Sequence, residues 1–349
     1  MTLRAGLIGH GSMGRNHARV LSRLDGVSLV AVADPAGDTD PTLCGVQLVP
    51  SVEGLLEHGV DYCVVAAPTI THEQIGLVLA DAGVHVLMEK PVAADSASAR
   101  SLVERFEQAG LIGAVGHIER YNPSLQQLKA RLLTGDLGEI YQVATRRQGP
   151  FPARIADIGV VKDLATHDID LTAWVTGRSY RAVSAQTAHK SGRAHEDLVA
   201  VTGLLDDGAT ANHLVNWLSP MKERVTIVTG ELGTFVADTL AGDLTFYANG
   251  TTAVNWPDII HFRGMTEGDV IRYAFPKPEP LRTEHEAFRD AVLGDESRIV
   301  TLRQGLDAVR VAEAVLASAA SGATVALDRS SAGNGAGPAL KRPAMRPSS

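Results

Sequence analysis

Over its first 120 residues the chain alternates short, almost wholly apolar runs with longer segments of helical periodicity. Apolar runs without alternation are typical of parallel strands buried on both faces, and parallel strands need crossover connections such as helices. The expected strands are Leu3–Gly9, Ser28–Asp34, Tyr62–Ala67, His85–Glu89 and Ile112–His117. The expected helices are Met13–Leu24, Glu73–Ala82 and Ser96–Ala109. Residues 1–120 are therefore predicted to form an α/β domain with a doubly wound parallel sheet.

After Arg120 the pattern changes to strands that alternate apolar and polar residues. Hairpin-turn signals stand at Asp206-Asp207-Gly208 and Ala248-Asn249-Gly250, which predicts a large, mostly antiparallel open sheet. Helical segments are expected at Ser124–Leu133, Thr283–Leu293 and Leu302–Ala320. Residues 121–329 are thus predicted to be an α+β domain, with the last helix, about 301–321, packing back towards the first domain. The Ser-, Ala-, Gly- and Pro-rich segment 330–349 is predicted to be a disordered tail.

Composition excludes several classes of protein. A net charge of −8 argues against nucleic acid as a partner, because phosphate binding needs a concentrated basic surface. No apolar run reaches the roughly 20 residues of a membrane-spanning helix, and no signal peptide is evident, so a cytoplasmic location is expected. Cys44 and Cys63 lack the spacing of a zinc site or a disulfide framework and are interpreted as small apolar residues.

The first expected strand ends in a glycine turn that opens the first helix. Gly9, Gly11 and Gly14 form the pattern GxGxxG of a Rossmann dinucleotide site: a tight turn, an open approach for a pyrophosphate, and close helix packing. Asp34 ends the second strand, 34 − 14 = 20 residues after the last glycine, where a carboxylate accepts hydrogen bonds from a ribose. This carboxylate would repel a 2′-phosphate, so NAD is favoured over NADP. The alternative is that the glycines only make turns and Asp34 only caps the loop.

Two further segments carry groups suited to acid–base chemistry. Glu89-Lys90-Pro91 ends the fourth strand at the sheet edge where ligands bind, although a solvated ion pair is an alternative interpretation. Asp163 and His167, with Asp168 and Asp170 following, are spaced to share one helix face. Removal of a hydride from a secondary alcohol needs a base near neutral pH, and histidine suits that task. The same spacing also occurs in metal sites, but further ligands are not evident nearby, so no metal is expected.

Together these motifs resemble the glucose-fructose oxidoreductase and inositol dehydrogenase (Gfo/Idh/MocA) family of two-domain NAD(P)-dependent dehydrogenases. The resemblance rests on the glycine turn with His17, on Glu89-Lys90-Pro91 and on the segment from Asp163 to Asp170. It implies that Lys90 hydrogen-bonds the reacting hydroxyl, that His167 is the general base, and that Asp163 supports the site or touches a substrate hydroxyl. The implied cofactor-binding residues are Gly9, Gly11, Ser12, Met13, Gly14, Asp34, Pro68, His72, Glu89 and Lys90. It further implies that residues 121–329 bind the substrate and form a homo-oligomer, a dimer or tetramer, through the C-terminal sheet.

Within that family, the stretches Gly116–Pro123 and Pro150–His167 look most like the branch that acts on UDP-N-acetylglucosamine at C3. Arg120 and Arg154 are then candidates for binding the diphosphate, with surface ion pairs as the alternative. The full predicted substrate set is Arg120, Asn122, Arg154, Asp163 and His167. Two other hypotheses remain open: a dehydrogenase of a free polyol or sugar such as myo-inositol, and a dinucleotide-binding sensor without turnover.

Overall fold

The computed structural model describes residues 2–37, 46–152, 158–250 and 266–328. The chain divides into two compact units, each of which is described by itself. Unit 1 comprises the chain up to Tyr121 together with Pro278–Glu313, and unit 2 comprises Asn122–Lys277 and the chain from Ala314 onward.

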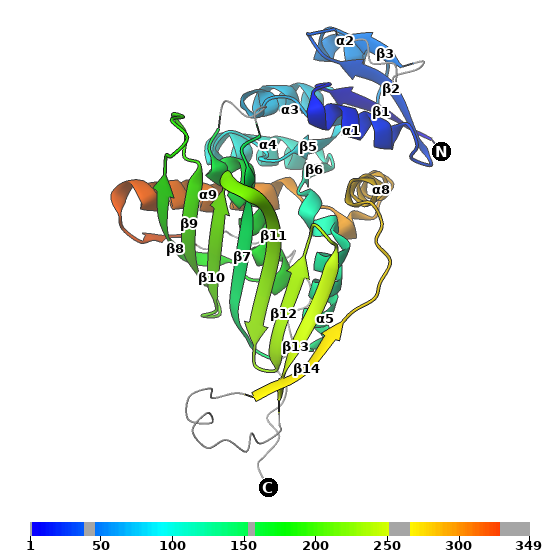
Figure 1. Cartoon of the computed structure of the whole chain (residues 1–349). Helices are drawn as coiled ribbons and strands as arrows, with labels where there is room; N and C mark the ends of the chain where they lie inside the picture. Colours follow the sequence, from blue (N-terminus) through cyan, green and yellow to red (C-terminus); the bar gives the residue numbers. More distant parts are fainter. Residues whose placement is uncertain (1, 38–45, 153–157, 251–265, 329–349) are drawn as a thin grey trace. The chain divides into compact units, whose positions relative to one another are not determined.

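Unit 1 is built on a sheet of six parallel strands in the described part of the chain, in the order β3-β2-β1-β4-β5-β6 (Figure 1). The strands are β1 (Leu3–Ile8), β2 (Val27–Ala33), β3 (Gln47–Val49), β4 (Tyr62–Val65), β5 (His85–Glu89) and β6 (Gly113–Gly116). The helices are α1 (Ser12–Leu21), α2 (Val52–Leu56), α3 (His72–Asp81), α4 (Ser96–Ala109), α8 (Pro280–Val292) and the part of α9 (Leu302–Ser321) up to Glu313. This strand order is that of a Rossmann fold, so the predicted α/β class is confirmed.

The strand register in unit 1 places several loop starts at one edge of the sheet. Ile8 at the end of β1 pairs with Ala33 of β2 and with Val65 of β4. Since the strands are parallel, the residues that follow them emerge side by side at this carboxyl edge, where open α/β sheets bind their ligands. The edge therefore collects the glycine turn, the loop of Asp34 and the loop after β4.

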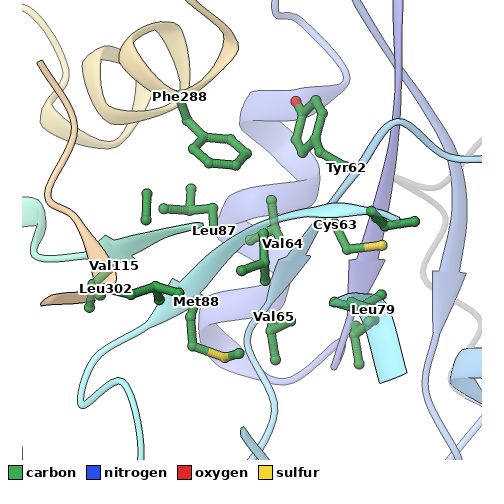
Figure 2. Close-up of a cluster of buried hydrophobic side chains, with 14 of the residues drawn as sticks. Tyr62, Cys63, Val64, Val65, Leu79, Leu87, Met88, Val115, Phe288 and Leu302 are labelled. Atoms are coloured by element: carbon green, nitrogen blue, oxygen red, sulfur yellow. The ribbon is translucent and has the colours of Figure 1, made fainter. Parts of the chain in front are cut away.

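The core of unit 1 joins the sheet to a helix from much later in the chain. Figure 2 shows Phe288 of α8 pointing towards Tyr62 of β4, and the two rings meet edge to face with centroids 5.2 Å apart. Both side chains are almost completely buried, and a buried aromatic side chain stabilises a fold by roughly 1.5–3 kcal/mol. The backbone adds a link, because Val115 N–H donates to Val300 O at 2.8 Å. The segment 278–313 thus completes the first domain rather than the second.

Unit 2 is built on a nine-stranded sheet, counted over its described residues, in the order β14-β13-β12-β11-β7-β10-β9-β8-β15 (Figure 1). Only β7 and β10 pair in parallel among these strands, which confirms a mostly antiparallel sheet. The strands are β7 (Ile140–Pro150), β8 (Tyr180–Ala188), β9 (Leu198–Leu205), β10 (Thr210–Asn216), β11 (Leu218–Gly230), β12 (Gly233–Asp238), β13 (Asp243–Gly250), β14 (Thr266–Arg272) and β15 (Val325–Ala326).

Two helices cover one face of the unit 2 sheet. Helix α5 (Pro123–Thr134) packs on β12 and β13, and α6 (Thr166–Thr176) packs on β7 and on α5. Successive residues alternate between the faces, so Thr145 and His213 are buried while their neighbours Arg146 and Leu214 are exposed. We call the second face, to which Arg146 and Leu214 point, the open face.

Of the two predicted hairpin turns, one is confirmed and one is wrong. Gly208, with φ of +97°, makes the turn between β9 and β10. The segment Ala248–Gly250 instead lies inside β13, where Ala248 pairs with Gly233 and Gly250 with Thr266. The Asn249 side chain donates to Glu231 O at 2.9 Å, so this amide stabilises an adjacent strand end instead of a turn of its own. The predicted tail, 330–349, lies outside the described residues.

Within the described ranges no helix is both long enough and apolar enough to cross a membrane. Cys63 is buried in β4 and burial raises the pKa of its thiol, which agrees with its interpretation as a small apolar residue. Cys44 lies outside the described residues.

Candidate active site

In the glycine turn after β1, other protein atoms pack closely against two of the glycines but not against the third. Gly9 has φ of +89°, and a Cβ there would lie 2.6 Å from Ala66 O. A Cβ on Gly14 would lie 2.0 Å from Gly9 O, so the first turn of α1 packs directly on the strand end. A Cβ on Gly11 would meet no atom within 4 Å. Side chains are thus excluded at Gly9 and Gly14 by the protein itself, whereas the space at Gly11 is available to a ligand.

The same turn leaves the N-terminus of α1 without a side-chain cap. Gly11 is the N-cap, no side chain bonds the first N–H groups, and the first turn holds no acidic residue. Ser12 is exposed and Met13 is half-buried. Backbone N–H groups and the helix dipole at such an end stabilise a phosphate. The residues present therefore fit the pyrophosphate of a dinucleotide.

Asp34 lies beside the turn and is held by two backbone groups. His10 N–H donates to Asp34 Oδ2 at 2.6 Å, and Ala36 N–H donates to Oδ1 at 2.8 Å. The carboxylate does cap its loop, as the alternative interpretation holds. Each carboxylate oxygen accepts more than one hydrogen bond, so loop capping leaves acceptor capacity for a ribose hydroxyl. The role of Asp34 towards the ribose stays a prediction.

His72 joins two loops at this edge of the sheet. Its Nε2 lies 3.0 Å from Ala67 O and its Nδ1 3.0 Å from Pro91 O. Burial lowers the pKa of His72, although both carbonyl groups act in the opposite direction, so the ring is neutral. Pro68 is exposed and caps the turn that leads into His72. The structure thus gives His72 a role in holding the loops after β4 and β5, and its predicted place in the cofactor cleft stays a prediction.

Glu89, at the end of β5, is an ionised carboxylate with little contact with solvent. Its side chain is 12% exposed, and its Oε1 lies 2.9 Å from Nε2 of His17. The Lys90 N–H donates to the other oxygen at 3.1 Å. Burial would raise the pKa of Glu89, but the His17 hydrogen bond and the charge of Lys90 outweigh it and the pKa is lowered. The segment Glu89-Lys90-Pro91, whose Lys90–Pro91 peptide is cis, is therefore a packed strand end.

Asp163 and His167 belong to unit 2, where a π-helical turn, η4 (Val161–Ala165), runs directly into α6. Asp163 lies in the π turn and is 6% exposed, and His167 lies in the first turn of α6 and is 8% exposed. The predicted helix is present, but the π turn changes the regular α spacing on which the shared-face prediction relied. Single π turns inside helices occur frequently at functional sites.

Glu196 holds the start of this π turn. Its Oε1 accepts a hydrogen bond from Val161 N–H at 3.0 Å, and its carbonyl accepts one from Val160 N–H at 3.0 Å. The approach needs a glycine, because a Cβ on Gly159 would lie 2.0 Å from the Glu196 carboxylate. No side chain of the N-cap residue bonds the first N–H groups of the π turn, and the distant Glu196 carboxylate takes that role.

Behind His167, a buried ion pair fixes α6 to the sheet. Arg147 Nε of β7 donates to Asp168 Oδ2 at 3.0 Å, and both side chains are 3% exposed or less. Next to it, His213 of β10 bonds Thr145 Oγ1 and the Tyr180 hydroxyl, each at 2.8 Å. Burial, assisted by the charge of Arg147, lowers the pKa of His213 to about 3. His213 is therefore a neutral structural residue beneath the helix of His167.

Two predicted substrate residues have structural partners. Arg120 is 6% exposed and its Nη1 donates to Gln304 Oε1 at 3.1 Å. Asn122 caps α5, since its Oδ1 accepts from Ser124 N–H at 3.1 Å and its Nδ2 donates to Thr239 O at 3.0 Å. A role in substrate binding stays a prediction for both and would compete with these contacts. Arg154 lies outside the described residues.

The predicted residues thus fall into two groups. Unit 1 brings the glycine turn, Asp34 and Glu89-Lys90 to the carboxyl edge of its sheet, and unit 2 holds Asp163 and His167 at the start of α6. His285 of α8 is a partner that the sequence interpretation missed: its Nε2 lies 2.8 Å from Nδ1 of His17, across 268 residues of chain. No local pattern signals a contact of that separation. In the described ranges, no three His, Cys, Asp or Glu residues are grouped as a metal site would require.

A Rossmann sheet with an open glycine turn, followed by an α+β domain with a large open sheet, defines a two-domain dinucleotide-dependent oxidoreductase. Residues 3–117 match the oxidoreductase family with an NAD-binding Rossmann fold, and residues 129–327 match the C-terminal alpha/beta domain of the same family. The chain therefore belongs to the Gfo/Idh/MocA oxidoreductase family, and its cofactor is NAD.

The chain is similar to dehydrogenases of two substrate types. Inositol 2-dehydrogenase 2 of Saccharopolyspora erythraea is 28% identical over 94% of this chain and 96% of its own length. UDP-N-acetylglucosamine 3-dehydrogenase of Acidithiobacillus ferrooxidans is 34% identical over 60% of this chain and 66% of its own length. A crystal structure of the Acidithiobacillus enzyme matches 91% of this chain and 98% of its own, with a TM-score of 0.78 and 26% identity.

The glycine turn yields a prediction for cofactor binding. We expect Gly11→Ala to unfold at the wild-type temperature, since φ is −70° and the space is open, but to raise the Kd for NAD about tenfold or more. Gly54→Ala, whose Cβ would make an ordinary 3.5 Å contact in α2, is the matched control with unchanged Kd. Titration calorimetry measures both, and an unaltered Kd in Gly11→Ala would show that no pyrophosphate approaches this residue.

The buried His213 yields a prediction for stability against pH. Its pKa is about 3 in the folded chain and about 6.5 when unfolded, so below pH 6.5 the unfolded state binds the extra proton. The free energy of unfolding should fall by up to about 1.4 kcal/mol per pH unit from this group as the pH drops from about 6.5 towards 3. His213→Gln should be less stable at neutral pH but show a shallower dependence in urea titrations. Equal slopes in both proteins would contradict the assignment.

Proposed function

We propose that this chain is an NAD-dependent dehydrogenase that oxidises C3 of UDP-N-acetylglucosamine or a related UDP-sugar to the 3-keto sugar nucleotide. The observation that carries the chemistry is the ionised, mostly buried Glu89 that adjoins Lys90 at the sheet edge of the glycine turn. The UDP-sugar assignment is supported by the likeness over most of the chain to the Acidithiobacillus enzyme, and by the motifs around Arg120 and Arg154.

Each proposed site residue has a separate role in the oxidation. The sugar hydroxyl loses its proton to His167, the C–H bond at the same carbon breaks with its electron pair, and a ketone remains. NAD⁺ supplies the acceptor for the hydride. Lys90 donates a hydrogen bond to the hydroxyl oxygen, which stabilises the negative charge that develops there. Asp163 supports the site or binds a neighbouring hydroxyl. Gly9 to Gly14 and Asp34 would hold the pyrophosphate and the ribose.

A second candidate keeps this mechanism with a free polyol. The full-length similarity to inositol 2-dehydrogenase 2 favours it, and a polyol needs no diphosphate-binding arginines. The structural partners of Arg120 and Asn122 also fit this candidate, because both side chains already have uses inside the protein.

Steady-state reduction of NAD⁺ across a panel of UDP-sugars and inositols tests both candidates. We expect turnover of UDP-N-acetylglucosamine, and a fall of about 10²–10⁴ in kcat for His167→Gln or Lys90→Met with NAD still bound, since each removes a group that acts on the hydroxyl. The exposed His189→Gln and Lys190→Met variants are the matched controls and should keep the wild-type kcat.

The other outcomes of the panel are equally informative. Turnover of inositol alone would replace the first candidate by the second, and Arg154→Ala should then leave KM unchanged. A higher KM for the UDP-sugar in Arg154→Ala would support a diphosphate contact. NAD binding without any reduction would leave the sensor hypothesis.

We also propose that copies of the chain pair through the open face of the unit 2 sheet. This face carries a hollow of about 500 Å³, and its lining includes Ala144, Ala200, Asn212 and Leu214. Leu214 is 40% exposed in the middle of the sheet, where pairing of two copies would bury its apolar side chain.

Light scattering on a sizing column tests this pairing. Leu214→Asp should convert a dimer or tetramer into smaller species, because a buried unpaired charge opposes association. Leu232→Asp, at a 50% exposed turn position, is the control with the wild-type mass. A wild-type chain that is monomeric at every concentration would contradict the proposal.

A further inference from the structure

Behind Lys90, unit 1 contains a buried chain of polar side chains from three separate segments. Glu89 ends β5, His17 lies in α1 and His285 lies in α8. His17 Nε2 is 2.9 Å from Glu89 Oε1, and His17 Nδ1 is 2.8 Å from His285 Nε2. Both histidines are 0% exposed. Packing alone does not require two buried imidazoles that contact one carboxylate, since apolar residues fill a core without hydrogen bonds.

The hydrogen-bonding chemistry of these three side chains determines which atom donates and which accepts in each contact. A carboxylate only accepts, so His17 donates from Nε2 to Glu89. The opposite nitrogen of His17 then meets His285, and the contact between the two rings contains one proton. Burial, and next the nearby His17, lower the pKa of His285 well below its usual range, so this ring is neutral. A neutral imidazole presents one donor and one acceptor, and its contact with Nδ1 fixes the orientation of the His17 ring.

A second carboxyl group, that of Glu284, lies near this cluster. It is neutral, so Glu89 is the charged carboxylate. Glu284 is 0% exposed, and neither side-chain oxygen has a hydrogen-bond partner among the described residues. Burial, and next the charge of Glu89, raise the pKa of Glu284 well above its usual range, so this acid is neutral. Two carboxyl groups whose environments separate their pKa values have different roles. The turn η3 (Ile118–Tyr121), which carries the buried Glu119 and Arg120, packs against α8 as well.

We propose that His285 is a positioning residue for Lys90 and acts through His17 and Glu89. The proposal rests on the proposed role of Lys90 in alcohol oxidation. His285 holds the His17 ring, His17 holds one oxygen of Glu89, and the other oxygen accepts the Lys90 N–H at 3.1 Å. Without His285 the His17 ring loses its fixed orientation, and the Glu89 carboxylate and the Lys90 backbone lose theirs in turn. A displacement of about 1 Å in a reacting group lowers the rate by as much as about 10²-fold.

Three variants in α8 test the proposal. His285→Leu removes the hydrogen bond, His285→Gln keeps a donor and an acceptor of similar reach, and Phe288→Leu disturbs the same helix where it packs on Tyr62. For each, kcat and KM are measured with the best substrate of the panel. The rate at which an acylating reagent modifies Lys90 is measured by mass spectrometry at one pH, and melting gives Tm.

We expect His285→Leu to lower kcat by about 10- to 100-fold with the KM for NAD unchanged, and to change the modification rate of Lys90. In His285→Gln, both kcat and the modification rate of Lys90 should return most of the way to their wild-type values. Phe288→Leu should lower Tm without changing the modification rate. If His285→Leu behaves like Phe288→Leu, or if His285→Gln recovers nothing, the proposal is overturned. Should the wild type oxidise no substrate, the proposed function fails, whereas the modification rate still decides the role of His285.

Glu284→Gln adds an independent check. Glutamine has the shape of a neutral glutamic acid, so kcat and the modification rate of Lys90 should stay at their wild-type values. A loss in either would contradict the assignment of Glu284 as a neutral residue without a role in positioning Lys90.

Discussion

The contact between Glu89 and His17 is the polar interaction that joins the separate parts of the candidate site in unit 1. It joins the end of β5 to the helix that the glycine turn opens, and the pair is nearly shielded from water. A buried charge without partners destabilises a fold by several kcal/mol, so an ionised Glu89 requires that His17, Lys90 and the surrounding helices all take their places. The glycine turn, the Glu89-Lys90 strand end and α8 are therefore one structural unit, although about 270 residues of chain separate the first from the last.

The return of residues 278–313 to unit 1 follows from the same need for burial. Tyr62 and Leu87 of the parallel sheet lie in the same buried cluster as Phe288, which α8 contributes (Figure 2). His285 lies one turn before Phe288 on the same helix, so one segment supplies both an apolar and a polar contact to the sheet and α1. Apolar packing thus brings the second histidine to His17, and the hydrogen bond adds a fixed orientation.

The sequence predicted those features that depend on neighbours in the chain. Helix Ser96–Ala109 was predicted from the periodicity of its apolar residues. The observed helix has the same bounds, because the Asp95 side chain accepts a hydrogen bond from Ser98 N–H and Gly110 adopts the left-handed conformation. The short β3 and α2 were missed, since three and five residues contain too little periodicity. The turn predicted at Asn249 was wrong, because a partner strand supplied the hydrogen bonds that a hairpin would have made locally. In the site, local patterns identified Gly9, Glu89 and His167 as candidates, but His285 and Glu196 are recognisable only when distant segments meet.

In unit 2 the surroundings of His167 use rigid polar contacts where a simple core would use apolar ones. The Arg147–Asp168 ion pair is almost without solvent, and a buried ion pair seldom stabilises a fold more than well-packed apolar residues do. The π turn that holds Asp163 is likewise an unfavourable local structure that persists because Glu196 and the glycine at 159 support it. Stability therefore does not explain these choices, whereas a need to fix the first turn of α6 does. Sites with local departures from the most stable arrangement are where function is expected, and here the departures surround Asp163 and His167.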